Sequence, residues 1–317
     1  MSTTYKRRKI VIGLFGFGTV GKGLWEVLNT TPALHASIKK ICIKNGHKER
    51  EAPQLLFTTS AEEILKDGEI NVVVELIDDA QAAFEIVKLA LENGKDVVSA
   101  NKKMIAENFE TLVDLQRKFG GSLLYEGACC ASIPVIRNLE EYYDNDMLTS
   151  IEGIINGSTN YILSSLAGSN ISFREALLEA QQLGYAESNP VLDIEGHDAA
   201  NKLSLLIAHG FGKIQPPGEL LYAGINNIRA TDTKLAKEKG LSIKLVATAK
   251  KLKQGNLAAF VLPQFVGKDN ELFHVHDVYN GLVTESSFAD KHFFKGKGAG
   301  AFPTAAAVLS DISALQY

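Results

Sequence analysis

KIVIGLFGFGTVGKGLWEVL, residues Lys9 to Leu28, decides the fold of the first part of the chain. An apolar run of strand type leads into a glycine-rich turn, after which apolar residues recur at the spacing of one helical face. A glycine-rich turn alone is common in α/β proteins. Between a strand and a helix, however, the pattern G-x-G-x-x-G lets the backbone approach a pyrophosphate. The stretch predicts a dinucleotide-binding turn with these candidate contacts: Gly16, Phe17, Gly18, Thr19, Val20 and Gly21.

The first half of the chain continues as alternating strands and helices. EINVVVELIDDA, AAFEIVKLALENG and KDVVSANKK repeat strand, helix and strand, and GGSLLYEGAC adds another strand. Near-continuous Val and Ile runs are typical of a parallel sheet covered on both faces. Ligands of such sheets bind beyond the carboxyl ends of the strands. The following polar residues fall there: Glu75, Ser99, Asn101, Lys102 and Glu126.

The residues after the second predicted strand, IKKICIKN, bear on the choice of cofactor. An acidic side chain usually stands there to bind the ribose 2′-hydroxyl of NAD, but this chain has Lys44, followed by Asn45, Lys48 and Arg50. A lysine at that place can meet a 2′-phosphate, so the sequence favours NADP and leaves NAD possible. The alternative is an ordinary solvated basic loop.

From about Ile133 the pattern changes. Predicted helices are followed by the strands IKLVATAKKL, LAAFVLPQFV and YNGLVTESSF, which are typical of a mixed or antiparallel sheet. The chain closes on a glycine turn and a small-residue helix, FFKGKGAGAFPTAAAVLSDISAL. A length of 317 residues also suggests two domains. We therefore expect an α/β protein with a Rossmann-like, doubly wound parallel sheet in residues 1–134 and a second, α+β domain after it.

The composition argues against several classes of protein. The formal net charge is −4 and no basic tract dominates, so nucleic acid is not an expected partner. No apolar run reaches membrane-spanning length, and glycines interrupt the run that follows the basic start, unlike a signal peptide. Cys42, Cys129 and Cys130 cannot all pair and lack zinc-ligand spacing, which indicates a reducing compartment. We expect a cytoplasmic protein that acts on a small molecule.

A highly charged stretch, GYAESNPVLDIEGHDAANK, leads directly into the apolar helix LSLLIAHGF. Asp198 and Lys202 are four residues apart, and an ordinary exposed i,i+4 pair is one interpretation. The helix is apolar on nearly every side, however, so we expect Lys202 to be partly buried. A buried lysine shifts readily in pKa and persists where a carboxylate or a ligand needs it.

Six motifs, in order and spacing, resemble the homoserine dehydrogenase family over nearly the whole chain. They are GFGTVGKG, SANKK, YEGACCASIP, EGIINGSTNYIL, GYAESNPVLDIEGHDAANK and GKGAGAFPTAAAVLSD. The resemblance implies reversible reduction of L-aspartate 4-semialdehyde to L-homoserine by NAD(P)H, in threonine and methionine biosynthesis. It also implies a homodimer. Residues 135–300 would carry the substrate site and the subunit contact, and a C-terminal helix, 301–317, would complete the first domain.

The resemblance assigns the catalytic groups. Hydride delivery to an aldehyde leaves an alkoxide, which needs a proton or a positive charge. Lys202 matches the family's catalytic lysine, and Asp198 would orient it. Lys102 resembles the second lysine of the site, and we prefer it to Lys103 because it directly follows Asn101.

Substrate and cofactor contacts follow from the same resemblance. Glu187 matches the carboxylate that receives the substrate α-ammonium, a role suited to an acceptor-only group. Asp193 matches another substrate-side carboxylate, Gly184 belongs to the same segment, and we expect Glu195 to face solvent. On the cofactor side the expected contacts also include a turn that would close over the nicotinamide, unless that turn is a plain loop. These residues are Ser99, Lys102, Gly298 and Gly300. If the chain ends at Tyr317, no appended ACT module is available for feedback.

Glu126 opens a stretch that matches the family's monovalent-cation loop. Its carboxylate and the main-chain oxygens of Cys129, Ala131 and Ile133 would form a cage for Na⁺ or K⁺. The alternative is that the cysteines are small buried hydrophobic residues.

The chain departs from the family pattern at a few positions, most of them in loops on the cofactor side. Glycines are usual at four of them, and aspartate at the fifth, before a proline. They are Asp78, Asp79, Ala131, Ser132 and Asn189.

Two other functions are open from the residues alone. Another amino-acid pathway dehydrogenase would share the glycine turn but has no reason to carry NGSTNY with GYAE and DAANK. A non-enzymatic dinucleotide sensor would need the turn but would gain nothing from two lysines at strand ends.

Overall fold

The computed structural model describes residues 8–31, 34–46, 49–142, 147–169 and 171–316, so that Lys48 lies outside the described residues. The described residues form two compact units. The first contains the chain up to Ser132 and the segment from Gly300 onward, and the second runs from Ile133 to Ala299. None of the described helices has the length and apolar character needed to cross a membrane.

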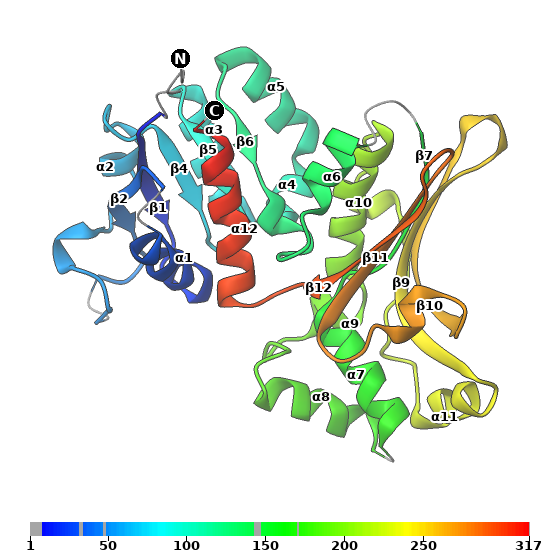
Figure 1. Cartoon of the computed structure of the whole chain (residues 1–317). Coiled ribbons are helices and arrows are strands. Elements are labelled where there is room, and N and C mark those ends of the chain that lie inside the picture. The colour runs from blue at the N-terminus through cyan, green and yellow to red at the C-terminus, as the bar shows by residue number, and fades with distance from the viewer. Residues whose placement is uncertain (1–7, 32–33, 47–48, 143–146, 170, 317) are drawn as a thin grey trace, which may run out of the picture. The chain divides into compact units, whose positions relative to one another are not determined.

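The first unit is built on a six-stranded sheet in the order β3-β2-β1-β4-β5-β6, in which every neighbouring pair is parallel (Figure 1). The strand order reverses between β1 and β4, so the sheet winds outward in both directions from that point. The predicted doubly wound parallel sheet is confirmed. Its strands are β1 (Ile10–Phe15), β2 (Ala36–Cys42), β3 (Phe57–Thr58), β4 (Val72–Glu75), β5 (Asp96–Ser99) and β6 (Leu123–Leu124).

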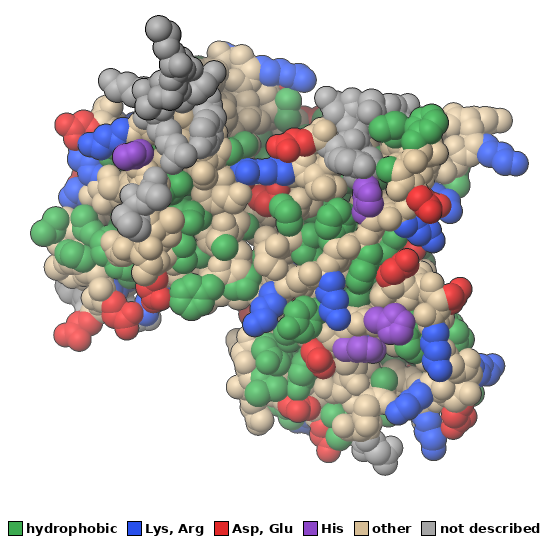
Figure 2. Space-filling model, in the orientation of Figure 1, with side chains coloured by type: hydrophobic (Ala, Val, Ile, Leu, Met, Phe, Trp, Pro, Cys, Tyr) green, Lys and Arg blue, Asp and Glu red, His purple; other side chains and the backbone are tan. Residues whose placement is uncertain are grey.

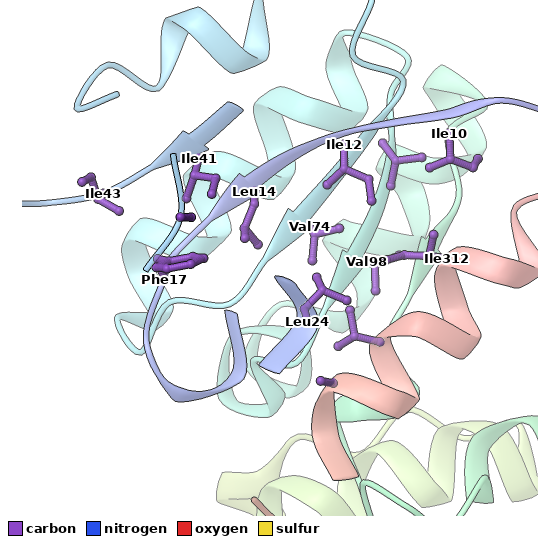
Figure 3. Packing of buried hydrophobic residues seen from close by; sticks show 14 residues of the cluster. Ile10, Ile12, Leu14, Phe17, Leu24, Ile41, Ile43, Val74, Val98 and Ile312 are labelled. Atoms are coloured by element: carbon purple, nitrogen blue, oxygen red, sulfur yellow. The ribbon is translucent and has the colours of Figure 1, made fainter. Parts of the chain in front are cut away.

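One face of this sheet packs against α1 (Thr19–Thr30) and α12 (Ala301–Ala314). Alternate residues of β1 point into this core, where Leu24 of α1 and Ile312 of α12 meet them (Figure 3). Both side chains are fully buried, and each contributes about 1.5–3 kcal/mol by leaving water. The C-terminal helix is therefore an integral part of the first unit.

The remaining helices of the first unit include several that contact one another and the 3₁₀ turn η2, which contacts α12. At Gly13 of β1 a Cβ atom would meet Ile64 of α2, so a residue without a side chain lets that helix lie against the strand. α3 contacts α2, α4 and α5. These elements are η1 (Gln54–Leu56), α2 (Glu62–Leu65), α3 (Ala80–Glu92), α4 (Lys102–Glu107), α5 (Phe109–Phe119) and the 3₁₀ turn η2 (Glu126–Ala128).

The second unit contains a six-stranded sheet in the order β12-β11-β7-β9-β10-β8. Its pairs are antiparallel except for β10 with β8, which confirms the predicted mixed sheet. The last strand was not predicted: DKHFFKGK is an edge strand with charged and glycine residues that hide its alternation. The strands are β7 (Leu148–Ile154), β8 (Leu221–Tyr222), β9 (Leu241–Lys251), β10 (Leu257–Gly267), β11 (Tyr279–Ser286) and β12 (Asp290–Lys297).

Helices of the second unit pack on this sheet, and Gly210 of α10 lies directly against Leu148 and Ile151 of β7. Ser172 caps α8, as its position before the helix predicted. Its hydroxyl oxygen accepts from the Glu175 N–H, and its own N–H donates to the Glu175 carboxylate. On the surface shown in Figure 2, acidic and basic side chains are interspersed. The elements are α6 (Val135–Tyr142), α7 (Gly157–Gly168), α8 (Phe173–Gln182), α9 (Val191–Ile194), α10 (His197–Phe211), η3 (Pro217–Glu219), α11 (Ala230–Glu238), η4 (Lys253–Gly255) and η5 (Glu271–His274).

Candidate active site

Asp198 and Lys202 lie in the first two turns of α10. The distance from Asp198 Oδ2 to Lys202 Nζ is 2.9 Å, and the two side chains are only 7% and 8% exposed. The interpretation as an ordinary surface pair is therefore wrong, and the expected burial of Lys202 is confirmed. A buried charge costs free energy unless it is paired and hydrogen-bonded. The ion pair therefore stabilises the charges of both Asp198 and Lys202 in this buried position.

The Lys202 ammonium also donates a hydrogen bond of 2.8 Å to the main-chain oxygen of Ile155, between β7 and α7. An ammonium group has three N–H donors. Within the described part of the chain, Asp198 and Ile155 supply the acceptors that Lys202 Nζ contacts. One N–H therefore remains for a further oxygen atom.

Asn156 stands where β7 passes into α7, and its side chain joins two carboxylates. Nδ2 donates to Asp193 Oδ1 at 2.7 Å and to Asp198 Oδ2 at 2.9 Å. Oδ1 accepts from the main-chain N–H of Thr159 at 2.8 Å and so caps α7. The structure thus brings together three predicted residues, Asp193, Asp198 and Lys202, through a residue that the sequence analysis did not assign.

Sequence reasoning missed the role of Asn156, although half of it had a signal. An asparagine directly before a predicted helix is a preferred N-cap. Its carboxylate partners, however, lie 37 and 42 residues further along the chain, on α9 and α10. Such contacts depend on how the helices pack and not on local spacing.

The segment with Gly184 and Glu187 forms an exposed turn after α8. Gly184 has a φ of +75°. The next residue, Tyr185, accepts a hydrogen bond of 2.6 Å at its main-chain oxygen from the Ser158 hydroxyl of α7. The main-chain oxygen of Glu187 accepts from the Gln181 amide at 2.8 Å. The turn is thus fastened to the first turn of α7, while the role of the exposed Glu187 carboxylate stays a prediction.

Glu195 and His197 flank the start of α10. His197 Nδ1 lies 3.0 Å from the Tyr222 hydroxyl, and its Nε2 lies 3.4 Å from Glu195 Oε2. The Glu195 side chain is 45% exposed, in agreement with the solvent-facing position that we expected.

The glycine turn of the first unit has the shape that a phosphate site requires. Gly16 has a φ of +93°, and a Cβ atom there would lie 2.6 Å from the Leu76 oxygen. At Gly21 a Cβ atom would lie 2.4 Å from the Gly16 oxygen, whereas nothing lies within 4 Å of that position on Gly18, the N-cap of α1. The first N–H groups of α1 therefore stand at an open place that fits an anionic group.

Glu75 and Ser99 form a buried pair at the carboxyl ends of β4 and β5. Ser99 Oγ donates to Glu75 Oε2 at 2.6 Å, and the Ile77 N–H donates to Glu75 Oε1 at 2.7 Å. Burial raises the pKa of Glu75 to about 7, and the negative charge of Asp78 acts in the same direction. Ser99 Oγ also accepts from the Asn101 N–H at 3.1 Å. These bonds fix the strand ends beside the glycine turn.

Lys102 and Lys103 open α4 after the cap residue Asn101, whose Oδ1 accepts from the Met104 N–H. Lys102 is half-buried, whereas Lys103 is exposed and lies 3.9 Å from Glu107. This difference favours Lys102 for a ligand contact. Its joint role with the lysine of α10 stays a prediction.

Lys44 is exposed in the turn after β2. In the same loop, Arg50 donates to the Asn45 oxygen at 2.8 Å, and its guanidinium lies 5.4 Å from the Phe57 ring centre. Phe57 meets Phe17 edge to face at 5.2 Å. The basic loop is thereby fastened beside the glycine turn, where a 2′-phosphate site was expected.

Glu126 opens η2 and is buried, and its main-chain N–H donates to Asp311 Oδ2 of α12 at 2.9 Å. Cys129, Ala131 and Ile133 are also buried. Among the described residues, no three His, Cys, Asp or Glu side chains are arranged to hold a metal ion. A cage of main-chain oxygens would not require such a group, and the cation loop stays a prediction.

Two departures from the family pattern have local structural explanations. Ala131 has a φ of +43°, a conformation that favours glycine, so alanine is tolerated there at some cost in strain. Asp79 caps α3, because its Oδ1 accepts from the Ala82 N–H at 3.0 Å.

Gly298 follows β12 and lies against a buried amide. A Cβ atom at Gly298 would lie 1.8 Å from Asn280 Nδ2. Asn280 is fully buried, and neither polar atom of its side chain has a hydrogen-bond partner among the described residues. Gly300, with a φ of +117°, is the N-cap of α12. An unpaired buried amide costs free energy, which marks this place as one where a polar ligand group would be stabilising.

Comparison with known proteins gives one family throughout. The family model described as homoserine dehydrogenase matches residues 134–313, and the model for the NAD-binding domain of homoserine dehydrogenase matches residues 16–126. The homoserine dehydrogenase of Synechocystis sp. is 37% identical, covering 96% of this chain and 72% of that protein. The Lactococcus lactis enzyme is 33% identical, covering 95% and 73%.

Solved structures agree with the sequence comparisons. A homoserine dehydrogenase from Thiobacillus denitrificans is similar with a TM-score of 0.90 at 32% identity, over 98% of this chain and 73% of that one. A hyperthermophilic archaeal homoserine dehydrogenase mutant in complex with NADPH has a TM-score of 0.81 at 25% identity, over 98% and 99% of the two chains. This chain belongs to the homoserine dehydrogenase family, whose members are NAD(P)-dependent oxidoreductases.

Proposed function

We propose that this chain interconverts L-aspartate 4-semialdehyde and L-homoserine, a step of threonine and methionine biosynthesis. The observation that carries the proposal is the Lys202 ammonium, which is buried and held by Asp198 and Ile155, and for which the described residues supply no third acceptor. Reduction of an aldehyde creates negative charge on its oxygen, and a fixed ammonium stabilises that charge and supplies the proton. In the reverse direction, neutral lysine accepts the proton from the alcohol.

The carboxylates around Lys202 have separate roles in this proposal. Asp198 orients the ammonium and holds its charge in a site that excludes most water. Asp193 accepts a hydrogen bond from the same Asn156 amide as Asp198 and would bind the polar end of the substrate. Glu187, on the turn fastened to α7, would receive the α-ammonium group, since a carboxylate is an acceptor-only partner.

The nicotinamide cofactor supplies or receives the hydride. The open N-terminus of α1 at Gly18 supports pyrophosphate binding there, next to the tight turn at Gly16. The buried amide of Asn280 beside Gly298, for which the described residues supply no hydrogen-bond partner, supports a polar contact to the cofactor at that turn. Ser99 and Lys102, at the end of β5 and the start of α4, complete the expected contacts.

We propose NADP as the preferred form of the cofactor, with NAD also accepted. Lys44 supports this preference, because it stands where an acid would bind the ribose of NAD. Arg50 keeps the same loop in place through Asn45 and Phe57. The archaeal relative in complex with NADPH is a second line of support.

A bound Na⁺ or K⁺ is proposed at Glu126 and the main-chain oxygens of Cys129, Ala131 and Ile133. The buried carboxylate of Glu126 supports it, because carboxylate and main-chain oxygens are the ligands that hard cations bind. Activity measured with Na⁺, K⁺ or a bulky organic cation as the only monovalent cation tests this site. Equal rates with all three would contradict it.

We also propose a homodimer, formed through the second unit. Exposed aromatic side chains on β10, β12 and the turn between β11 and β12 support it, because aromatic residues are enriched at protein–protein interfaces. They are Phe265 (65%), Phe288 (86%) and Phe293 (39%). A monomer by light scattering at micromolar concentration would contradict the proposal.

A cytoplasmic location is proposed on the cysteine content alone. Cys129 and Cys130 are buried and Cys42 is half-buried, as suits a reducing compartment. Fractionation of cells that express the chain tests the location.

One assay tests the proposed function as a whole. The protein is incubated with L-homoserine and NADP, and the reduced nicotinamide is followed by absorbance. We expect turnover with homoserine and none with other small hydroxy amino acids. Turnover with a different amino-acid substrate would favour another pathway dehydrogenase, and cofactor binding without any turnover would favour a sensor.

A further inference from the structure

The side-chain amide of Asn156 has its acceptor and both donor hydrogens engaged, and the residue is 4% exposed. Oδ1 accepts from both the N–H and the hydroxyl of Thr159, at 2.8 and 2.9 Å. A main-chain N–H is always a donor, so the oxygen must face Thr159 and the NH₂ group must face the other way. That orientation directs its two hydrogens at Asp193 and Asp198.

This arrangement requires asparagine in particular. Serine, threonine, aspartate and glycine are also favoured N-caps, but none of them carries an NH₂ group. Asparagine alone can cap α7 with its oxygen and bridge two carboxylates with its nitrogen. The cap and the bridge are thus two functions of one side chain.

The bridge has an electrostatic consequence for the site. Asp198 is buried and Asp193 is half-buried, and two carboxylates that share one donor group in such a place repel each other unless hydrogen bonds stabilise their charges. Asn156 gives one hydrogen bond to each, and its bond to Asp198 ends on the same oxygen, Oδ2, that accepts from Lys202. Hydrogen bonds of this network join the titratable groups Asp193 of α9 and Asp198 and Lys202 of α10.

We propose that Asn156 is a positioning residue for the reaction: its amide keeps Asp193 and Asp198 both ionised and so holds the Lys202 ammonium in place. The inference rests on the proposed function, since it acts through the lysine assigned there. Without the amide, a proton or a water molecule would compete with Lys202 for Asp198. The ammonium would then lose its fixed direction.

Two substitutions separate the bridge from the cap. Asn156→Ser and Asn156→Asp both keep an N-cap acceptor for Thr159, but neither places an NH₂ group between the carboxylates. We expect kcat for homoserine oxidation to fall roughly 10- to 100-fold in both, the usual cost of lost hydrogen bonds to charged groups. NADP affinity should stay within threefold of the parent value, because the cofactor turn lies on other elements.

The pH dependence distinguishes positioning from a structural role. In Asn156→Asp a third carboxylate joins the cluster, and a proton taken up at low pH restores one donor. The ratio of variant to parent kcat should therefore rise as the pH falls from 9 to 6. In Asn156→Ser the same ratio should stay flat. Ratios that are flat in both variants, or a kcat of Asn156→Ser within threefold of the parent, would overturn the proposal.

Asn270 provides the matched control. Its side chain caps η5 by accepting from the Leu272 N–H at 2.9 Å, so Asn270→Asp makes the same chemical change at another cap of the second unit. We expect parent-like kcat with a flat pH ratio. A loss of kcat in Asn270→Asp equal to that in Asn156→Asp would show that any cap change in this unit has the same effect, and would overturn the proposal.

A measurement without turnover keeps the test separate from the proposed function. The added carboxylate of Asn156→Asp is buried beside two others, so its folded-state pKa lies above its unfolded value. The stability of this variant relative to Asn270→Asp should then fall as the pH rises from about 5 to 8. A constant difference would contradict the clustered charges even if the parent did not oxidise homoserine. An inactive parent would contradict the proposed function instead.

Discussion

Asp198 and Lys202 form a 2.9 Å ion pair one turn apart on α10, with both side chains almost fully removed from solvent. The pair between Glu62 of α2 and Lys66, the C-cap residue of that helix, has the same spacing and the same distance, but its side chains are about 70% exposed. Exposed pairs contribute about 0.3–0.5 kcal/mol, whereas removal of one member of a buried pair costs several kcal/mol. Loss of the lysine should therefore have a small effect on stability in the exposed pair and a large effect in the buried pair.

Substitution of Lys202 should abolish most of the catalysis while cofactor binding persists. In Lys202→Ala the developing alkoxide loses its ammonium, so kcat and kcat/KM should fall together by roughly 10²- to 10⁴-fold. Lys202→Arg keeps a charge but cannot release a proton at neutral pH, so it should also be poor. Steady-state kinetics on protein that still binds NADP checks both variants.

Lys66→Ala is the control for this prediction, because it removes a lysine from a pair with the same spacing. We expect parent-like kinetics and a change in unfolding free energy below about 0.5 kcal/mol. If Lys202→Ala behaved in the same way, with activity within threefold of the parent, the assignment of Lys202 as the catalytic lysine would be wrong.

Glu187→Gln should weaken substrate binding selectively. Glutamine keeps the shape of the side chain but removes the charge that would receive the α-ammonium, so KM for homoserine should rise while the Kd for NADP barely changes. Glu195→Gln is the matched control nearby: that carboxylate is also exposed but has no proposed contact with the substrate, so its loss should leave KM unchanged. A collapse of NADP affinity in Glu187→Gln would place Glu187 on the cofactor side.

Lys44→Asp should change the choice between cofactors. The substitution removes a positive charge from the expected 2′-phosphate position and adds repulsion, so NADP binding should weaken by about 1–3 kcal/mol more than NAD binding. Titration calorimetry with both cofactors gives the difference directly. Equal losses for NADP and NAD would mean that Lys44 belongs to an ordinary solvated loop.

The first unit could be predicted in detail because its signals are local. A pyrophosphate turn needs glycine at Gly16 and Gly21, where a Cβ atom would meet main-chain oxygens, and apolar strands buried on both faces need continuous Val and Ile runs. The apolar helix that contains Lys202 also predicted the burial of this lysine, whereas its catalytic role was predicted only from the family resemblance. Local chemistry therefore sufficed for the sheet, the glycine turn and the burial of Lys202.

What could not be predicted depends on packing between distant segments. β12 is an edge strand whose polar composition resembles a loop, and α9 has only four residues. The bridge from Asn156 to Asp193 and Asp198 forms only when α7, α9 and α10 meet. No spacing rule along the chain contains that information.

The buried carboxylate of Glu75 makes stability depend on pH. It accepts hydrogen bonds from Ser99 and Ile77, but loss of hydration dominates and raises its pKa from an ordinary value of 4.5 to about 7. Between these two pH values the folded protein keeps a proton that the unfolded chain releases. The free energy of unfolding should therefore fall as the pH rises through this window, by about 3 kcal/mol in total.

Glu75→Gln should remove this dependence, because an amide does not ionise. Its oxygen can still accept from the Ile77 N–H, and its NH₂ group can donate to Ser99 Oγ once the hydroxyl rotates. Near pH 5 the two proteins should therefore have similar stability, and the variant should gain on the parent up to about pH 7 and then keep that advantage to pH 8. Urea unfolding at pH 5, 6, 7 and 8 checks the trend. A difference between variant and parent that did not change with pH would mean that Glu75 stays ionised in the folded protein, stabilised by Ser99 and Ile77 more strongly than burial disfavours it.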